Sequence, residues 1–414
     1  MEDTSPAGPL SGLLVLDLSR ILAGPTCTQL LGDLGADVIK VERLGRGDDT
    51  RAWGPPFLEN DKSDLPPQSA YYLSSNRNKR SLALDVSKPE GQDLIRRLAA
   101  KADILIENYK VGDLARRGLG YDDLSTLNAR LVYCSISGFG QTGPYAKRPG
   151  YDFLIQGMGG IMSITGEPDG RSLKTGVGIA DVMCGMYATA AILSAIEHRH
   201  KTGKGQYIDL GLLDTQIAWL INQGAAYLVS GDTPQRLGNG HPTIVPYDTV
   251  PASDGEFIIA VGNDSQFQRL CETLGAPEWS SDPRFEKNTD RVANRHVLMA
   301  LIAEQTSKKS KTHWIEALEK VTVPCGPVNT IPEAFADPQA FERQMIIEME
   351  SPVGGSDPLK LIGNPIKMSE TPVSYRRPPP RVGQHSKDIL ISVLEMDEAA
   401  VDSLVNSGVV GVEE

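Results

Sequence analysis

The stretch LLVLDLSRILAGPTCTQLLGDLGADVIKV, residues 13–41, decides the fold class of this chain. Its first apolar run, 13–18, is typical of a buried strand, and a second strand is expected over 37–41. Between them, 25–34 reads as a helix with a proline near its start, where a missing backbone N–H costs nothing. The stretch therefore predicts a strand, a helix and a strand in succession.

The same rhythm continues further along the chain. A helix is expected over 90–99, followed by strands over 103–107 and 131–136. Alternation of this kind predicts an α/β fold with a doubly wound, Rossmann-like parallel sheet and helices on both faces. A nicotinamide dinucleotide would require G-x-G-x-x-G in the first strand–helix turn. That turn is SRILAGP (19–25), with a single glycine, and no P-loop is present, so neither phosphate-binding motif is indicated.

With 414 residues the chain is too long for one ordinary core, and two domains are expected. Short strands such as 257–261 alternate with charged helical segments in the second half, which predicts a smaller α+β domain. The Pro-rich RRPPPRVG (376–383) suggests a semi-rigid connection over a surface. The expected division is a large domain over 1–205, a linker over 206–225, a small domain over 226–330, and a linker with a C-terminal segment over 331–414.

Charge and composition exclude several function classes. The net charge of −12 and a pI near 5.1 argue against general binding to nucleic acid or to an anionic membrane. An anionic ligand would therefore need a local basic pocket. No run of about 20 apolar residues suggests a membrane span. The N-terminal MEDTSPAGPLSG carries no targeting pattern, so a cytoplasmic location is expected.

Cysteines and histidines give no metal or disulfide signal. The five cysteines are scattered and never form C-x-x-C, which favours reduced, buried thiols. His198 and His200 are two apart on an expected helix, so their side chains point in different directions and shared metal binding is not indicated. His241, in GNGHPTIVPY, suits either a pocket lining or an ordinary loop.

Asp181 lies between a glycine-containing turn and an apolar helical run, 183–196. One interpretation is a helix N-cap, in which the carboxylate accepts backbone N–H groups and contributes about 1 kcal/mol. The other is a carboxylate in a dry pocket, available as a nucleophile. The local pattern alone favours the cap.

Longer motifs change that balance. LDLSRILAGPTCTQLLGDLGADVIKVER (16–43), NRNKRSLALDV (76–86), IENY (106–109) and the region around Asp181 resemble the class III CoA-transferases, from about residue 9 to about residue 410. Within that family the chain is most similar to the succinyl-CoA:glutarate type. This similarity is carried by GDDTRAWGPPF (47–57), YCSISGFGQTGPY (133–145), GNGHPTIVPYDT (238–249) and RPPPRVGQH (377–385).

The resemblance implies an activity and an assembly. Asp181 falls on the family's catalytic aspartate, which would attack an acyl-CoA thioester, form a mixed anhydride and then carry CoA as an aspartyl thioester. The substrates would be acyl-CoA thioesters and carboxylic acids, with succinyl-CoA as donor and a dicarboxylate such as glutarate as acceptor, and with no permanently bound cofactor or metal. The family's fold also implies a C-terminal segment that returns to the large domain, and an interlocked homodimer.

The family's CoA-binding positions can be carried over where this sequence matches them. The first strand–helix loop should line CoA near its phosphates and thiol, and its main-chain amides are the more transferable part. Arginine suits phosphate because its planar fork binds two oxygens at once. The expected contacts are Arg20, Ile21, Leu22 and Ala23 in that loop, Arg43 at the nucleotide phosphates, Leu84 and Val86 beside the adenine, Asn108 and Arg116 along the phosphates and pantetheine, and Tyr151 near the acyl end.

Two departures from the formyl-CoA transferase pattern bear on specificity. Arg20 and Leu22 stand where that enzyme has His and Gln, and an added arginine favours a substrate with a second carboxylate. The tetraglycine lid of that enzyme has no counterpart here, and VGND (261–264) is one candidate to shield the anhydride.

Two other functions remain open from the sequence. An α-methylacyl-CoA racemase would need a histidine where this chain has Tyr151, and a tyrosine with an ordinary pKa near 10 is a poor base near neutral pH. A non-catalytic CoA-binding protein is the other, and an intact Asp181 argues against it.

Overall fold

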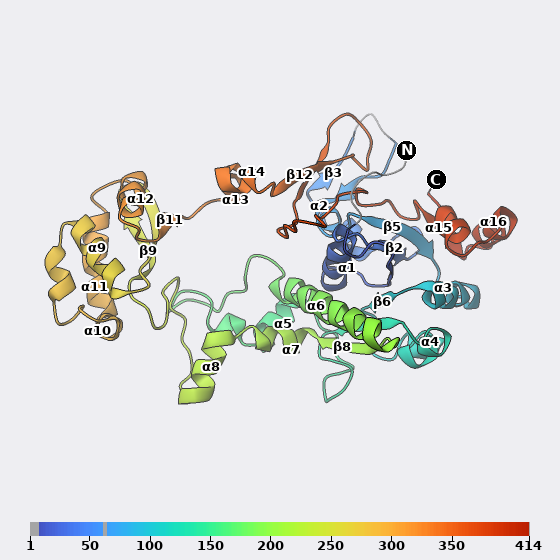
Figure 1. Cartoon of the computed structure of the whole chain (residues 1–414), viewed down its shortest axis with the longest axis horizontal. Coiled ribbons are helices and arrows are strands. Elements are labelled where there is room, and N and C mark those ends of the chain that lie inside the picture. Colours follow the sequence, from blue (N-terminus) through green and yellow to red (C-terminus); the bar gives the residue numbers. More distant parts are fainter. Residues whose placement is uncertain (1–7, 61–63, 414) are drawn as a thin grey trace. The chain divides into compact units, whose positions relative to one another are not determined.

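The computed structural model describes residues 8–60 and 64–413. It divides into two compact units (Figure 1). The large unit comprises Met1–Ile161, Thr175–Gly224 and Pro338–Glu414, and the small unit comprises Met162–Lys174 and Ala225–Asp337. Residues 206–225, expected as a linker, hold instead β8 (Tyr207–Gly211), α7 (Leu212–Ala218) and the start of α8 (Ile221–Ser230). These residues do not form the expected linker, because β8 is the edge strand that completes the seven-stranded sheet of the large unit.

The large unit is built on a seven-stranded sheet in the order β14-β5-β2-β1-β6-β7-β8. All neighbouring strands are parallel except β14, which pairs antiparallel with β5. The strand order reverses at β1, which pairs with β2 on one side and β6 on the other. In open α/β sheets such a reversal creates a crevice at the carboxyl ends of the strands, where ligands bind. The bounds are β1 (Leu14–Asp17), β2 (Asp37–Glu42), β5 (Lys79–Leu84), β6 (Ile104–Glu107), β7 (Val132–Ser137) and β14 (Val410–Gly411).

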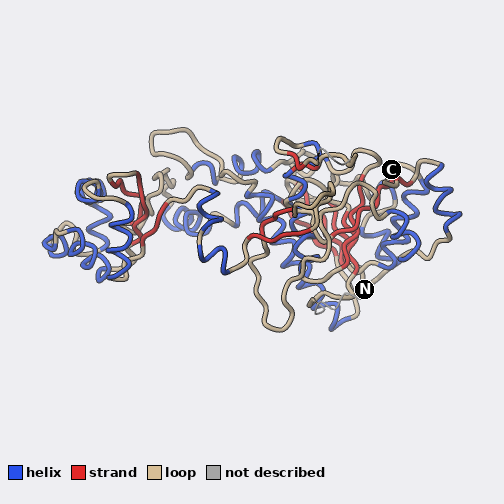
Figure 2. The backbone as a smooth tube through the Cα atoms, turned by 90° about the horizontal axis from the view of Figure 1, so that it is seen from above, coloured by secondary structure: helices blue, strands red, loops and turns tan. Residues whose placement is uncertain are grey.

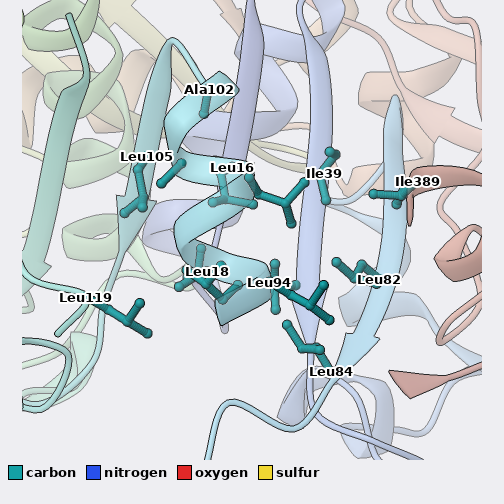
Figure 3. Packing of buried hydrophobic residues seen from close by; sticks show 14 of the residues in the cluster. Leu16, Leu18, Ile39, Leu82, Leu84, Leu94, Ala102, Leu105, Leu119 and Ile389 are labelled. Atoms are coloured by element: carbon teal, nitrogen blue, oxygen red, sulfur yellow. The ribbon is translucent and has the colours of Figure 1, made fainter. Parts of the chain in front are cut away.

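Helices cover both faces of this sheet, which confirms the doubly wound α/β class (Figures 1 and 2). Successive residues of a strand point to opposite faces. Leu16 and Ile39 therefore pack against α3 (Pro89–Lys101), α4 (Tyr121–Leu127), α15 (Ser386–Ser392) and α16 (Glu398–Asn406), as Figure 3 shows for part of this core. Val15 and Val38 pack on the other face against α1 (Ala23–Asp33) and α6 (Ile179–Thr202).

Helices α1 and α6 approach each other closely at Gly185. A Cβ added there would lie 2.6 Å from the carbonyl oxygen of Ala23, closer than real Cβ atoms come. Glycine therefore allows the start of α6 to lie against the first strand–helix loop. In the described part of the chain, α6 is also the one helix long and apolar enough to cross a membrane, with mean hydropathy 1.7. Half of that apolar window is buried within the protein, as in the core helices of many soluble proteins.

The C-terminal segment packs on the large unit. It contains a two-stranded sheet of β12 (Ile346–Met349) and β13 (Leu359–Ile362), and then the Pro-rich connection. The centre of that connection is buried. Pro380 accepts hydrogen bonds through its carbonyl from Tyr72 Oη at 3.0 Å and Arg51 Nη2 at 2.9 Å. Hydrogen bonds from the large unit therefore hold the connection in place, whereas the sequence predicted that it runs over the surface.

The small unit has its own core around an antiparallel sheet of β9 (Tyr247–Ala252), β10 (Gly255–Ala260) and β11 (Cys325–Pro327). Phe257 and Ile259 of β10 are buried against Phe267, Leu298 and Trp314. These come from α9 (Asp264–Leu274), α11 (Arg295–Thr306) and α12 (Lys311–Lys320). The remaining α-helices and β-strands are short: β3 (Phe57–Leu58), β4 (Gln68–Ser69), α2 (Ala70–Leu73), α5 (Asp152–Met158), α10 (Asn288–Ala293), α13 (Ile331–Ala336) and α14 (Pro338–Glu342).

Candidate active site

A cavity of about 240 Å³ lies at the carboxyl ends of the central strands of the large unit. Arg20 and Ile21 reach it from the loop after β1, Asn108 from the end of β6, and Ser137 from the end of β7. Asp181 contributes from the first turn of α6. The cavity therefore occupies the crevice that the reversal of strand order creates.

Asp181 is not the N-cap of α6. The helix begins at Ile179 with Gly178 as its N-cap, four residues before the predicted run, and the capping interpretation of Asp181 is wrong. The carboxylate at this helix start comes instead from Asp152, the first residue of α5. Its Oδ1 accepts hydrogen bonds from the backbone N–H of Ala180 at 2.8 Å and of Asp181 at 3.3 Å. This leaves the side chain of Asp181 available to the cavity.

The surroundings of Asp181 make it an unusually basic carboxylate. Burial raises its pKa from 3.8 to about 7, and the neighbouring Asp152 adds to the shift. A carboxylate that is both basic and poorly solvated is a better nucleophile than one in water. Near neutral pH a substantial part of Asp181 is ionised.

The first strand–helix loop is held in a strained shape. Ile21 has a φ of +73°, in the left-handed region that β-branched residues rarely adopt. Its backbone N–H donates to both carboxylate oxygens of Asp48 at 3.2 Å. Asp48 is in turn paired with Lys40 Nζ at 2.9 Å, and both side chains are fully buried. Lys40 Nζ also donates to the carbonyl of Ser19 at 3.1 Å, so one ammonium group fixes both sides of the loop.

A second buried carboxylate lies at the end of β1. Asp17 accepts hydrogen bonds from the amide and hydroxyl of Ser19, from Thr28 Oγ1, and from Lys79 Nζ at 3.3 Å. Burial alone would raise the pKa of Asp17, but Lys79, Lys40 and these hydroxyls lower it. Asp17, Lys40, Asp48 and Lys79 thus form a buried network beneath the loop. We had not predicted this network. Its signal in the sequence was the presence of charged residues inside otherwise apolar strands.

A second cavity of about 470 Å³ continues from the first and shares Arg20, Tyr109 and Lys110 with it. Arg43 and Arg116 also line it. The structure thus brings cationic side chains together in one trough, made of these two adjoining cavities, and Asp181 lines the first of them. Arg20 and Arg43 both form ion pairs with Asp49, and Arg116 pairs with Asp113.

Asn108 fixes the position of Arg20. Its Oδ1 accepts from the Arg20 backbone N–H at 3.0 Å, and its Nδ2 donates to the Arg20 carbonyl at 2.7 Å. Ala23, predicted to line CoA near its phosphates and thiol, and the exposed Tyr151, predicted near the acyl end, both line the Asp181 cavity.

Three expected contact residues lie outside both cavities. Leu84 is 1% exposed and packed in the core, and Val86 is partly buried against the same core. Leu22 is the N-cap of α1 and, like the other two, lines neither cavity. Residues that we had not predicted line the Asp181 cavity instead, namely Lys110, Ser137, Lys147 and Arg148. Lysines and arginines are common on surfaces, so only the folded chain shows which of them meet.

No group of three or more potential metal ligands occurs among residues 8–60 and 64–413. His200 Nδ1 lies 3.9 Å from Glu197, one turn earlier on α6.

The fold and the site together define an α/β enzyme class in which an anionic nucleotide ligand can lie along a cationic trough beside a reactive carboxylate. The chain belongs to CoA-transferase family III, whose family model matches residues 10–386. The resemblance read from the sequence is thereby confirmed, and the chain is a CoA-transferase.

Individual relatives agree with the family. The chain is 49% identical to succinate–glutarate CoA-transferase of Agrobacterium fabrum, over 95% of this chain and 97% of that protein. It is 41% identical to human succinyl-CoA:glutarate CoA-transferase, over 99% of this chain and 91% of that protein. A crystal structure of a CaiB/BaiF family protein from Brucella suis matches with a TM-score of 0.83 and 48% identity, covering 94% of this chain and all of that one.

Substitution of Asp152 tests its influence on Asp181. We expect Asp152→Asn to lower the pKa of Asp181, because a neighbouring negative charge is removed while burial, the larger cause, remains. The acidic limb of the pH profile of kcat/KM should move to lower pH, without reaching 3.8. Asparagine keeps an oxygen that can accept from the Ala180 N–H, so the helix start is preserved. An acidic limb that stays in place or moves to higher pH would contradict the prediction.

Proposed function

We propose that this enzyme transfers CoA from succinyl-CoA to a dicarboxylic acid such as glutarate, through covalent intermediates on Asp181. The observation that carries the proposal is a partly buried carboxylate with a pKa of about 7 that lines a cationic trough. The names of the relatives support the choice of acids.

The proposed reaction needs nucleophiles that are already anions. An oxygen of Asp181 attacks the thioester carbonyl, the C–S bond breaks, and a mixed anhydride and CoA thiolate form. The thiolate attacks the aspartyl carbonyl and releases succinate, leaving CoA bound to Asp181 as a thioester. The carboxylate of the acceptor displaces the thiolate, which then attacks the acceptor's acyl carbonyl. This releases the new acyl-CoA and restores Asp181, with no net proton transfer.

The trough supplies the contacts expected for CoA. We propose that Arg43, Arg116 and Lys110 bind its phosphates, since they line one cavity together. The amides of Ala23 and its neighbours would lie along the pantetheine. Leu84 could contact a ligand only through its main chain, because its side chain is buried.

We also propose a homodimer. Three adjacent helices, α5, α6 and α7, expose large apolar side chains, whereas monomeric proteins rarely expose extended apolar patches. Light scattering behind size exclusion should give twice the mass of the chain, and a monomeric mass would contradict this proposal. The exposed residues are Phe153, Leu154, Met158, Met186, Tyr187, Ile217 and Trp219.

Chemical trapping tests the covalent mechanism. The protein is incubated with succinyl-CoA, treated with borohydride or hydroxylamine, digested and analysed by mass spectrometry. We expect modification at Asp181 in the wild type and none in Asp181→Asn treated in parallel. An unmodified Asp181 while glutaryl-CoA is still being formed would contradict the mechanism.

A further inference from the structure

Arg148 differs from the other arginines of the site in its partners. Arg20 and Arg43 are both paired with Asp49, and Arg116 with Asp113. Arg148 lines the Asp181 cavity, but no described residue offers its guanidinium a carboxylate or another hydrogen-bond acceptor.

Aromatic rings hold this guanidinium in place. Its central carbon lies 4.5 Å from the centre of the Tyr145 ring and 5.2 Å from that of Phe139. The two rings pack edge to face with centres 5.5 Å apart, and the Arg148 backbone N–H donates to the Tyr145 carbonyl at 2.8 Å. Contact with a ring face leaves the N–H groups at the edge of the guanidinium free to donate.

The charge balance of the cavity favours an acyl group with a second carboxylate. Its lining contains Arg20, Lys110, Lys147 and Arg148, and Asp181 is the single acidic residue among the described residues that line it. When Asp181 forms an anhydride, its carboxylate loses its negative charge. A carboxylate at the far end of the acyl group would then be the anion facing these cations.

A second hydrogen-bonding group lines the same cavity. Ser137, at the end of β7, is among the residues that line the cavity, and its Oγ is enclosed by protein without a hydrogen-bond partner among the described residues. Buried hydroxyl groups are normally paired, so this one is available to donate to a ligand once rotation about its Cα–Cβ bond turns it towards the cavity.

We propose that Arg148 binds the distal carboxylate of the dicarboxylic acyl group, with the Ser137 hydroxyl as a second donor. Arg148 is then the residue that selects acids with two carboxylates, a role that the sequence suggested for Arg20. Because Arg20 is already paired with Asp49, it is the weaker candidate. The assignment rests on the proposed function.

A competition experiment measures the selectivity directly. Succinyl-CoA is supplied with equal concentrations of glutarate and pentanoate, which have the same chain length and differ in the second carboxylate. Both acids compete for the same enzyme form, so the ratio of glutaryl-CoA to pentanoyl-CoA equals the ratio of their kcat/KM values. We expect Arg148→Met to lower this ratio by about 10-fold to 100-fold, the range for losing a charge-assisted hydrogen bond. Arg148→Lys should recover part of the loss.

Lys147→Met is the matched control, because Lys147 is the adjacent cation on the same loop and lines the same cavity. It should change the ratio less than Arg148→Met does. An equal change would show that overall charge selects the acid, and overturn the assignment. So would an Arg148→Met enzyme that loses both products in the same proportion, which would indicate a CoA contact. A wild type that traps succinyl-CoA on Asp181 but forms no glutaryl-CoA would refute the proposed acceptor instead.

Discussion

Asp181→Asn is expected to abolish CoA transfer and, at the same time, to stabilise the folded protein above neutral pH. The loss of activity follows from the proposed mechanism, since an amide cannot form the anhydride or carry CoA. Affinity for CoA should stay within a few-fold of the wild type, because Arg43 and Arg116 lie in the adjoining cavity.

The gain in stability follows from the raised pKa. The folded state holds the Asp181 proton more tightly than the unfolded state, with a pKa of about 7 against 3.8. Ionised Asp181 therefore disfavours folding, by about 4 kcal/mol when the pH is well above 7. This cost declines as the pH falls from 7 towards 4, because the folded state is then protonated and the unfolded state approaches its own pKa of 3.8.

Urea unfolding at pH 8.5 and at pH 4 tests this prediction. The Asp181→Asn variant should be more stable than the wild type at pH 8.5, and this difference in stability should shrink at pH 4. Transfer activity is measured on the same samples. A difference in stability between the variant and the wild type that is the same at both pH values would show that Asp181 is not buried as the structure has it. Retained activity would contradict the covalent mechanism.

Lys40→Met should cause the largest loss of stability. It removes the cation that is paired with Asp48 and leaves that carboxylate buried and without its counter-ion. Breaking a buried pair in this way costs about 3–5 kcal/mol. The strained Ile21 depends on the same carboxylate, so binding of CoA should also weaken.

Two further variants isolate the cause. Lys40→Met combined with Asp48→Asn removes both charges and should recover part of the loss. Arg43→Met, one residue beyond β2, breaks an exposed pair with Asp49 and should cost less than about 1 kcal/mol. Urea unfolding compares all three with the wild type. Equal losses for Lys40→Met and Arg43→Met would contradict the account of the buried network.

The sequence was a good guide to the large unit because its elements repeat a strongly patterned strand–helix rhythm. The expected strand over 37–41 and the helix over 25–34 differ from β2 and α1 by only one or two residues at their ends. The family motifs placed Asp181 in the site. Its local role was harder to foresee, because the group that caps α6 is Asp152, which lies 29 residues earlier.

What the sequence could not give was the set of contacts between distant residues. Asp49, which holds Arg20 and Arg43, and the rings that hold Arg148 carry no signal in spacing or composition. Leu84 is the opposite case, a residue that the family motif predicted as a ligand contact but whose side chain is enclosed in the core. Side-chain exposure follows from packing rather than from motif.

The antiparallel strand β14 has a consequence for how the chain folds while the ribosome synthesises it. The small unit is mostly one continuous stretch, Ala225–Asp337, so its core can close while later codons are still being read. The edge of β5, however, is covered only when Val410 and Gly411 pair with Leu84 and Ala83. Until then a nascent large unit displays an open sheet edge, the kind that recruits other chains. We therefore expect chaperones to matter most in the interval before β14 emerges.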